Sequence, residues 1–187
     1  MTTWTSKGPL LAAALLLLTG CEVGPVGSGA APKGLSQARM GGGALRLVPP
    51  PGYCIDQGSL KARFALLARC DAFAAVDTVS DAPRGMITFS MLPAPAGAEL
   101  PSPETIAKAA RLTRLSEVES TAAETIFRAV GPVPVKGVSP RHWRAAALID
   151  GQLVGIALYG PEDGRAITGD GRMLIKALIA RSRAANP

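Results

Sequence analysis

The chain has 187 residues, which allows one compact domain plus tails but not two full domains or a repeat array. Apolar residues make up 48% of it, which excludes intrinsic disorder as its general state, and only 18% of residues are charged and 4% aromatic. The formal net charge is +6, but no basic cluster is interleaved with aromatic residues, so the charge does not indicate a nucleic-acid partner.

The N-terminus has the pattern of a secretory signal peptide. Leu10–Leu18 is an uninterrupted run of Leu and Ala that is too short to span about 30 Å of hydrocarbon. The tetrapeptide Leu18-Thr19-Gly20-Cys21 follows it and resembles the lipobox of bacterial lipoproteins. The resemblance implies cleavage after residue 20 and lipidation of Cys21. An ordinary core cysteine after an apolar helix is the alternative.

A flexible linker is predicted after the lipidated cysteine. Residues 22–43 are rich in Gly, Pro, Ala and Ser and end in Gly41–Gly43. A flexible chain of this length spans on the order of 25 Å. The predicted organisation is a signal peptide over 1–20, lipidated Cys21 and linker over 21–43, and a folded domain over 44–187. Acyl chains on Cys21 would hold the domain to the membrane.

The first half of the domain is predicted to be mainly extended. Leu45–Val48 is a short strand that ends at three prolines, Tyr53–Asp56 is a second apolar segment, and Met86–Leu92 alternates like a half-buried strand. Phe64–Cys70 fits a helix or a strand, and we favour a strand. The helical alternative uses Leu60, Phe64 and Leu67, whereas one face of a strand would carry Phe64, Leu66, Ala68 and Cys70.

A helix is predicted to begin after Ser102. The serine hydroxyl can cap it, Pro103 loses no hydrogen bond in the first turn, and the Glu104 carboxylate favours the positive end of the helix. The predicted packing stripe is Ile106, Ala109, Ala110 and Thr113, and the predicted solvated side carries Lys108, Arg111 and Arg114.

Three antiparallel strands are predicted next. Glu124–Val130 is rich in β-favouring residues, although Thr121 and Glu124 are also spaced like a helix capping box. Arg141–Ile149 and Gln152–Tyr159 flank Asp150-Gly151, a pair suited to a type I′ turn. That turn sets Trp143 opposite Leu158, Ala145 opposite Ile156 and Ala147 opposite Val154 on a core face, and leaves His142, Arg144, Leu148, Leu153, Gly155 and Tyr159 on a partly polar face.

The chain is predicted to end in a helix that follows a polar turn over Pro161–Gly169. Asp170 is the predicted cap, and arginines near the C-terminal end complement the helix dipole. The buried face is predicted to carry Leu174, Ile175, Leu178, Ile179 and Ser182. The predicted fold class is α+β, an antiparallel sheet with two main helices packed on one face.

Two cysteines remain once Cys21 carries lipid. In an oxidising compartment, Cys54 and Cys70 are predicted to form a disulfide that closes a loop of about 16 residues. Two buried free thiols are the alternative.

Catalytic, metal and cofactor sites are not predicted. The single histidine excludes a multi-histidine zinc site, and the Cys-x-x-Cys, Gly-x-Ser-x-Gly, Ser-x-x-Lys and P-loop patterns do not occur. His142, Arg144 and Tyr159 form the one cluster that could bind a ligand or serve a small periplasmic enzyme; a satisfied surface group is the simpler interpretation. Gly169–Arg172 could bind an anion, but a turn plus helix cap also explains it.

Three segments carry a wider resemblance. Gly52–Asp56, Phe64–Asp71 and Ser139–Trp143 together resemble a family of small lipoproteins from alphaproteobacteria, over about Leu45 to the C-terminus. Some members are labelled cation transport ATPases. Because this chain has neither a P-loop nor an Asp-Lys-Thr-Gly motif, the resemblance implies at most an accessory subunit of a membrane transporter. The order of elements also resembles the PsbP-like fold.

The sequence therefore predicts a non-catalytic, lipid-anchored module on the periplasmic side that binds an envelope protein. A pocket holding His142 and a buried carboxylate would favour an enzyme instead, whereas a flat or apolar exposed patch would favour the binding module. Glu22 is not the aspartate usually associated with inner-membrane retention, so either membrane remains open.

Overall fold

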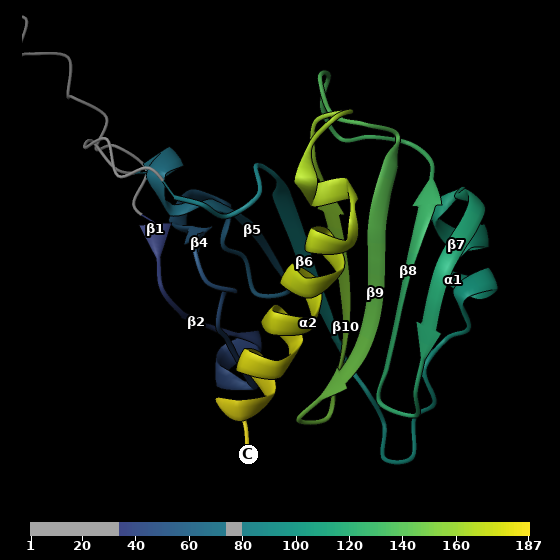
Figure 1. Cartoon of the computed structure of the whole chain (residues 1–187). Helices are drawn as coiled ribbons and strands as arrows, with labels where there is room; N and C mark the ends of the chain where they lie inside the picture. The colour runs from purple at the N-terminus through teal and green to yellow at the C-terminus, as the bar shows by residue number, and fades with distance from the viewer. Residues whose placement is uncertain (1–33, 74–79) are drawn as a thin grey trace, which may run out of the picture.

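The computed structural model describes residues 34–73 and 80–187 (Figure 1). Its centre is an eight-stranded antiparallel sheet with the strand order β1-β4-β5-β6-β10-β9-β8-β7, joined by a two-stranded β2–β3 hairpin and two α-helices. The α+β class predicted from the sequence is confirmed. Within these residues no helix has the length and hydropathy to span a membrane. The predicted signal peptide and Cys21 lie outside the described residues.

The main sheet consists of β1 (Gly34–Leu35), β4 (Tyr53–Asp56), β5 (Phe64–Arg69), β6 (Met86–Pro93), β7 (Thr113–Ser120), β8 (Glu124–Val130), β9 (Arg141–Ile149) and β10 (Gln152–Tyr159). The remaining elements are β2 (Ala38–Met40), β3 (Leu45–Leu47), α1 (Pro103–Ala110), α2 (Gly169–Ala184) and four short 3-10 turns, of which η3 (Cys70–Phe73) and η4 (Arg165–Ile167) enter the argument below.

The β9–β10 hairpin has the predicted turn and register. Asp150 and Gly151 adopt φ values of 45° and 67°, the left-handed conformations that a type I′ turn requires. Ile149 pairs with Gln152, and Trp143 pairs with Leu158. Since side chains alternate along a strand, this register decides which side chains of β9 and β10 lie on each face of the sheet.

One face of the sheet, here called the α2 face, carries the main core. Trp143, Phe89 and Leu158 are fully buried on it and pack with the apolar stripe of α2. All five predicted stripe residues of α2 are buried. The β2–β3 hairpin adds Met40 to the same core. The α2 face is thus closed by both elements.

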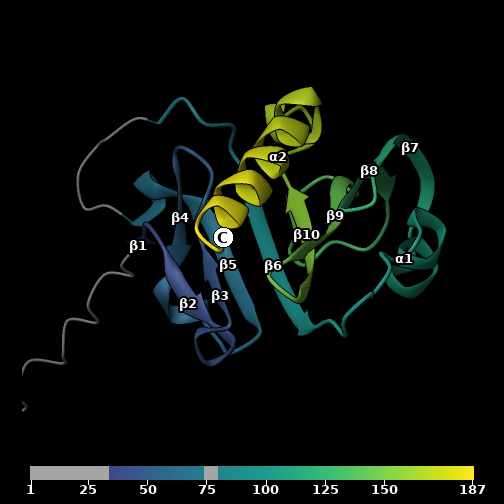
Figure 2. The same ribbon diagram turned by 90° about the horizontal axis from the view of Figure 1, so that it is seen from below.

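The opposite face, here called the α1 face, is covered at one end only. Ile126 of β8 belongs to the main core, whereas Phe127 and Ala129 alternate to the other side and pack with Ala107 and Leu112 in a second cluster. The two helices therefore lie on opposite faces, as Figure 2 shows, and the prediction that both pack on one face is wrong. The reason is that β8 presents apolar residues on both of its sides.

Helix α1 is shorter than its predicted stripe. It ends at Ala110, because Arg111 takes a left-handed conformation (φ 55°) as its C-cap, and Thr113 begins strand β7. Ala107, not Ala109, is its buried residue. The β7 strand was not predicted. A C-cap of this kind is usually glycine, so an arginine there leaves no sequence signal for the helix end.

The N-terminal boundary of the folded domain also lies earlier than predicted. Residues 34–43, assigned above to the linker, form β1, β2 and a 3-10 turn, and Met40 is 1% exposed. Gly34 and Leu35 pair with β4. Small residues in this segment fit close approaches: a Cβ on Gly34 would lie 2.9 Å from Cys54 Cβ. The glycine-rich residues 34–43 are therefore part of the packed structure.

The start of α2 differs from the prediction by a few residues. Thr168 is the N-cap, its hydroxyl accepting a hydrogen bond from the Asp170 backbone N–H, and Asp170 lies in the first turn where it pairs with Arg165. The predicted polar turn before the helix contains η4, whose Ala166 and Ile167 are buried. Cys54 and Cys70 are joined in a disulfide that links β4 to the start of η3.

Candidate functional site

The predicted cluster of His142, Arg144 and Tyr159 assembles on the α1 face. Tyr159 stacks on His142 with ring centroids 4.7 Å apart. Arg144 donates from Nε to His142 Nε2 at 3.0 Å and from an Nη to the Tyr159 hydroxyl at 2.8 Å. The strand register brings these residues together because β9 and β10 are neighbours and all three side chains point to the same side. The cluster therefore exists as predicted, but its chemistry depends on its surroundings.

His142 is committed to internal hydrogen bonds. Its Nδ1 lies 2.8 Å from the Pro140 carbonyl oxygen, and an arginine Nε–H can only donate, so Nε2 accepts and Nδ1 carries the proton. Burial, with the Arg144 charge beside it, lowers the pKa of His142 to about 4. The ring is 0% exposed and neutral, and neither nitrogen is left to take a proton from a substrate.

The cluster also lacks the carboxylate that would orient a histidine base. Arg144 takes part in none of the ion pairs found among the described residues. Burial lowers the pKa of its guanidinium group. A hollow of about 610 Å³ lies elsewhere, between Ser80–Pro83 and α2. Within residues 34–73 and 80–187, no three metal-ligating side chains gather in one place. The geometry meets neither condition set above for an enzyme at His142.

The other sequence candidates are structural. The residues Gly169–Arg172 form the first turn of α2, where Gly171 is buried and Arg172 pairs with Glu119 at 2.9 Å. Glu162 and Asp163 are exposed in the polar turn that was predicted over Pro161–Gly169. The Arg172–Glu119 pair thus ties the first turn of α2 to β7.

An apolar strip remains open on the α1 face beyond the reach of α1. Phe64, at the start of β5, is 40% exposed, and Leu92, near the end of β6, is 55% exposed. Phe64 pairs with Ser90, so the two apolar side chains are diagonal neighbours on one face. Leu66 continues the strip along β5 and is half-buried. We call Phe64, Leu66 and Leu92 the open strip.

A small apolar pocket adjoins the open strip. It measures about 180 Å³ and lies where the sheet meets α1 and the chain before it, with Leu92, Leu153, Ile106 and Pro101 in its wall. Leu92 therefore belongs both to the strip and to the pocket rim. A flat apolar surface that ends in a recess of this size suits the insertion of an apolar side chain from another molecule.

The sequence carried a weak signal for this surface. Phe64 and Leu66 were noted as one side of a possible strand, and the structure confirms that strand but buries Ala65 and Leu67 instead. Leu92 follows Thr88 and Ser90 on the outward side of β6, where a polar residue would be expected. Which side of β5 was buried depended on the neighbouring strands, so the open strip was missed.

No protein-family model matches the chain, and no curated protein matches it. Solved structures with a similar arrangement include a point mutant of the protein Mog1, with a TM-score of 0.52 and 12% identity over 78% of this chain and 93% of that chain. They also include the Saccharomyces cerevisiae Ran-binding protein Mog1p, with a TM-score of 0.50 and 13% identity over 78% of this chain and 92% of that one. At these identities the similarity shows the fold alone.

A further structural neighbour is the cyanobacterial PsbP of Synechocystis sp. PCC 6803. Its TM-score is 0.39 and its identity 14%, over 85% of this chain and 98% of that chain. A superposition this loose carries no argument. The fold similarity that bears on this protein is therefore the one to Mog1.

Proposed function

We propose that this protein is a lipid-anchored envelope lipoprotein whose domain binds a partner protein on the periplasmic side and performs no catalysis. The lipobox over residues 18–21 supports the location, and the Cys54–Cys70 disulfide fits an oxidising compartment. The resemblance to alphaproteobacterial lipoproteins supports the same assignment. The partner is an envelope protein, and an accessory role beside a membrane transporter is one form of it.

The open strip is the observation that carries the binding role. Large apolar side chains that stay exposed together on a sheet face mark interaction surfaces in soluble domains. The strip ends in the apolar pocket beside Leu92, so it offers both a flat contact and a recess for an anchoring residue. Lys61 and Arg63, both exposed, precede Phe64 along the chain and favour a partner with acidic groups around its apolar contact.

The fold and the His142 cluster support the same role. The Saccharomyces cerevisiae neighbour is described as a Ran-binding protein, so this fold supports protein binding in at least that case. In the His142 cluster, which the sequence offered as a candidate enzyme site, both ring nitrogens of His142 are engaged in internal hydrogen bonds. The binding role therefore relies only on groups at the surface of the domain, such as those of the open strip.

The anchor is tested by metabolic labelling. Cells that express the protein are fed labelled palmitate, and the label is expected in the mature chain of the wild type and not in Cys21→Ser. The Cys21→Ser variant is expected to keep its leader because the lipid is added before cleavage. A wild-type chain without label, or a Cys21→Ser chain that is still processed and membrane-bound, would remove the anchor from the proposal.

The binding surface is tested by site-specific photo-crosslinking in intact cells. A photoreactive amino acid is placed at Leu92 or, as a matched control, at Met173, an apolar side chain of α2 that is 63% exposed on the other side of the sheet. We expect a discrete crosslinked protein from position 92 and none from position 173. The adduct at 92 should disappear when Phe64→Asp is added. Equal labelling from both positions, or an adduct indifferent to Phe64→Asp, would contradict the assignment.

A further inference from the structure

Strand β7 pairs with β8 in an irregular way. Thr113 pairs with Val130, Ser116 with Arg128 and Glu119 with Ile126, so β7 advances three residues for every two of its neighbour. Each step is a β-bulge, and the extra residue takes a left-handed conformation: Arg114 at φ 50° and Glu117 at φ 51°. Both are non-glycine residues, which rarely adopt this conformation.

The two bulges place Arg114 and Glu117 at equivalent positions along β7. Glu117 reaches Arg128 of β8 and pairs with it at 2.5 Å. Arg114 lies one repeat earlier, beside the end of β8 and the start of β9, where Val130 pairs with Arg141. The first bulge therefore places Arg114 beside Arg128 and Arg141, at the position equivalent to the one that Glu117 takes in the second bulge.

These arginines line a small polar pocket. It measures about 260 Å³, and its wall contains Arg114, Arg128 and Arg141 together with Ser116 but no carboxylate. We call it the arginine pocket. Of the three arginines, Arg128 pairs with Glu117, whereas Arg114 and Arg141 take part in none of the ion pairs found among residues 34–73 and 80–187. Two arginines without an ion-pair partner among the described residues thus line one recess.

Arg128, the third arginine of the pocket, is fixed by contacts with neighbouring residues. One Nη of Arg128 donates to the Ile167 carbonyl oxygen at 3.2 Å, the other pairs with Glu117, and its plane lies over the Trp143 ring, 5.7 Å from the centroid. Its Nε–H is buried with no hydrogen-bond partner. A guanidinium fixed by several contacts loses little entropy when a ligand arrives, which favours binding.

We propose that the arginine pocket binds the phosphoryl group of a phosphorylated solute or lipid headgroup. Arginine presents paired N–H donors that match the oxygens of phosphate, and converging guanidinium groups of like charge are stabilised by an anion between them. A phosphate monoester carries up to two negative charges, which matches the two cations without an acidic partner; a single carboxylate would neutralise one of them. The site is independent of the open strip, which lies on the α1 face.

The test is thermal unfolding of the full-length protein, purified in non-ionic detergent, with and without inorganic phosphate at constant ionic strength. A ligand that binds only the folded state raises the unfolding temperature, and at a concentration 100 times its Kd it shifts the folding equilibrium about 100-fold. Wild type is expected to respond to phosphate and not to chloride. Arg141→Gln is expected to lower the apparent phosphate affinity about tenfold or more.

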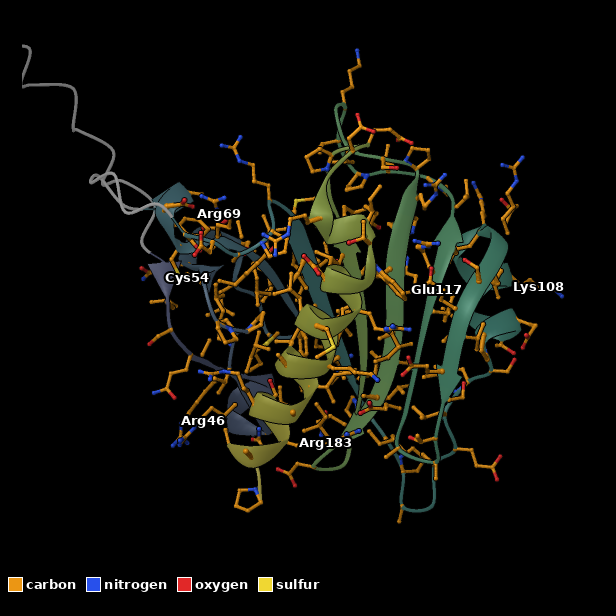
Figure 3. All side chains as sticks on the ribbon, in the orientation of Figure 1. Arg46, Cys54, Arg69, Lys108, Glu117 and Arg183 are labelled. Atoms are coloured by element: carbon orange, nitrogen blue, oxygen red, sulfur yellow. A yellow bond between two sulfur atoms is a disulfide. The ribbon has the colours of Figure 1, made fainter. Side chains whose placement is uncertain are left out.

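Two further variants separate the site from folding and from general charge. Arg114→Asn removes the cation but keeps a residue that tolerates the left-handed conformation, so it should fold and still lose the response. Arg46→Gln removes a cation on β3, at the opposite side of the molecule from Glu117 in Figure 3. This variant should still respond to phosphate. A wild type that responds neither to inorganic phosphate nor to phosphatidic acid, or a response that is equal in Arg114→Asn, Arg141→Gln and Arg46→Gln, would overturn the proposal.

The source of the phosphoryl group is resolved with mixed micelles. The unfolding experiment is repeated without free phosphate, with either phosphatidic acid or phosphatidylcholine in the detergent micelles. Phosphatidylcholine is the control because choline masks its phosphate. A response to free phosphate assigns a soluble ligand, and a response to phosphatidic acid alone assigns a lipid headgroup; either supports the site when Arg114→Asn abolishes it. Because none of these measurements involves the partner of the open strip, failure here leaves the proposed function standing.

Discussion

The two faces of the sheet are built from the same strands but differ in how they are completed. On the α2 face, side chains such as Trp143 and Phe89 lie at 0% exposure beneath α2 and the β2–β3 hairpin. On the α1 face, one short helix covers Phe127 and Ala129, while Leu92 stays 55% exposed. The α1 face also contains the buried polar cluster of His142, Arg144 and Tyr159.

This difference separates stability from recognition. The α2 face holds the contiguous core that stabilises the domain, so its residues have little freedom to change. The α1 face keeps exposed apolar residues and a buried histidine that the core does not require. The predictions below test whether stability is concentrated on one face, from the largest expected effect to the smallest.

The largest effect is expected from Trp143→Ala on the α2 face. The indole is fully buried, and its Nε1–H donates to the Thr168 carbonyl oxygen at 2.9 Å. Loss of a buried tryptophan of this kind lowers the free energy of unfolding by about 3–5 kcal/mol. Equilibrium denaturation in urea measures it. Leu92→Ala is the control and should cost less than about 1 kcal/mol; similar losses in both would contradict the division between the faces.

The His142 cluster predicts an acid sensitivity that originates on the α1 face. In the folded state the pKa of His142 is about 4, against about 6.5 in the unfolded chain. Between these values the unfolded state binds a proton and the folded state does not, so the free energy of unfolding falls as pH drops from 6.5 toward 4. This loss in the free energy of unfolding is on the order of 3 kcal/mol at pH 4 and vanishes above pH 6.5.

Urea denaturation at a series of pH values from 4 to 7 measures this component. His142→Gln keeps a polar side chain without the titration, so its stability should fall less steeply over the same range. Carboxylates contribute equally to both proteins and cancel in the difference. Parallel pH profiles would show that His142 does not stay neutral in the folded protein.

The disulfide is expected to stabilise the open end of the α1 face. Cys54 and Cys70 are 16 residues apart, and closing a loop of that length contributes about 3 kcal/mol by restricting the unfolded chain. Reduction of the purified protein should lower its unfolding temperature, and the double variant Cys54→Ser, Cys70→Ser should unfold at the lower temperature whether or not reductant is present. An unchanged transition after complete reduction would exclude this role.

The smallest of these effects concerns how α2 lies on its face. A Cβ on Gly171 would lie 1.9 Å from the Ala166 carbonyl oxygen and 2.7 Å from Trp143 Cδ1, whereas nothing lies within 4 Å of one on Gly169. Gly171→Ala should therefore destabilise the protein by about 1–3 kcal/mol. Gly169→Ala in the same first turn should be neutral or slightly stabilising. Equal stabilities would mean that α2 can move away from β9 at no cost.

Several parts of the fold could be predicted because their signals are local. The Asp150-Gly151 pair specifies its turn through backbone conformations that few residues adopt, and that turn sets the register of β9 and β10. The apolar spacing from Leu174 to Ser182 specifies the buried side of α2. In both cases a few neighbouring residues contain the whole physical cause.

Other parts could not be predicted because their causes lie elsewhere in the chain. Arg111 ends α1 in a conformation for which an arginine gives no warning, and β7 exists because β8 offers it an edge. The arginine pocket depends on two bulges in that pairing, and nothing in the spacing of residues 114, 128 and 141 indicates it. The His142 cluster was identified from alternation, but whether its histidine could act as a base was not.

By itself, the sequence determined the lipobox signal, the hairpin register, the stripe of α2 and the α+β class, because each follows from local backbone preference or from the period of apolar residues. Only the tertiary structure decided that the helices lie on opposite faces, that His142 is sealed and neutral, and that Phe64 and Leu92 remain exposed. The physical reason is that burial belongs to a side chain and its neighbours together, and those neighbours come from strands far apart in the chain.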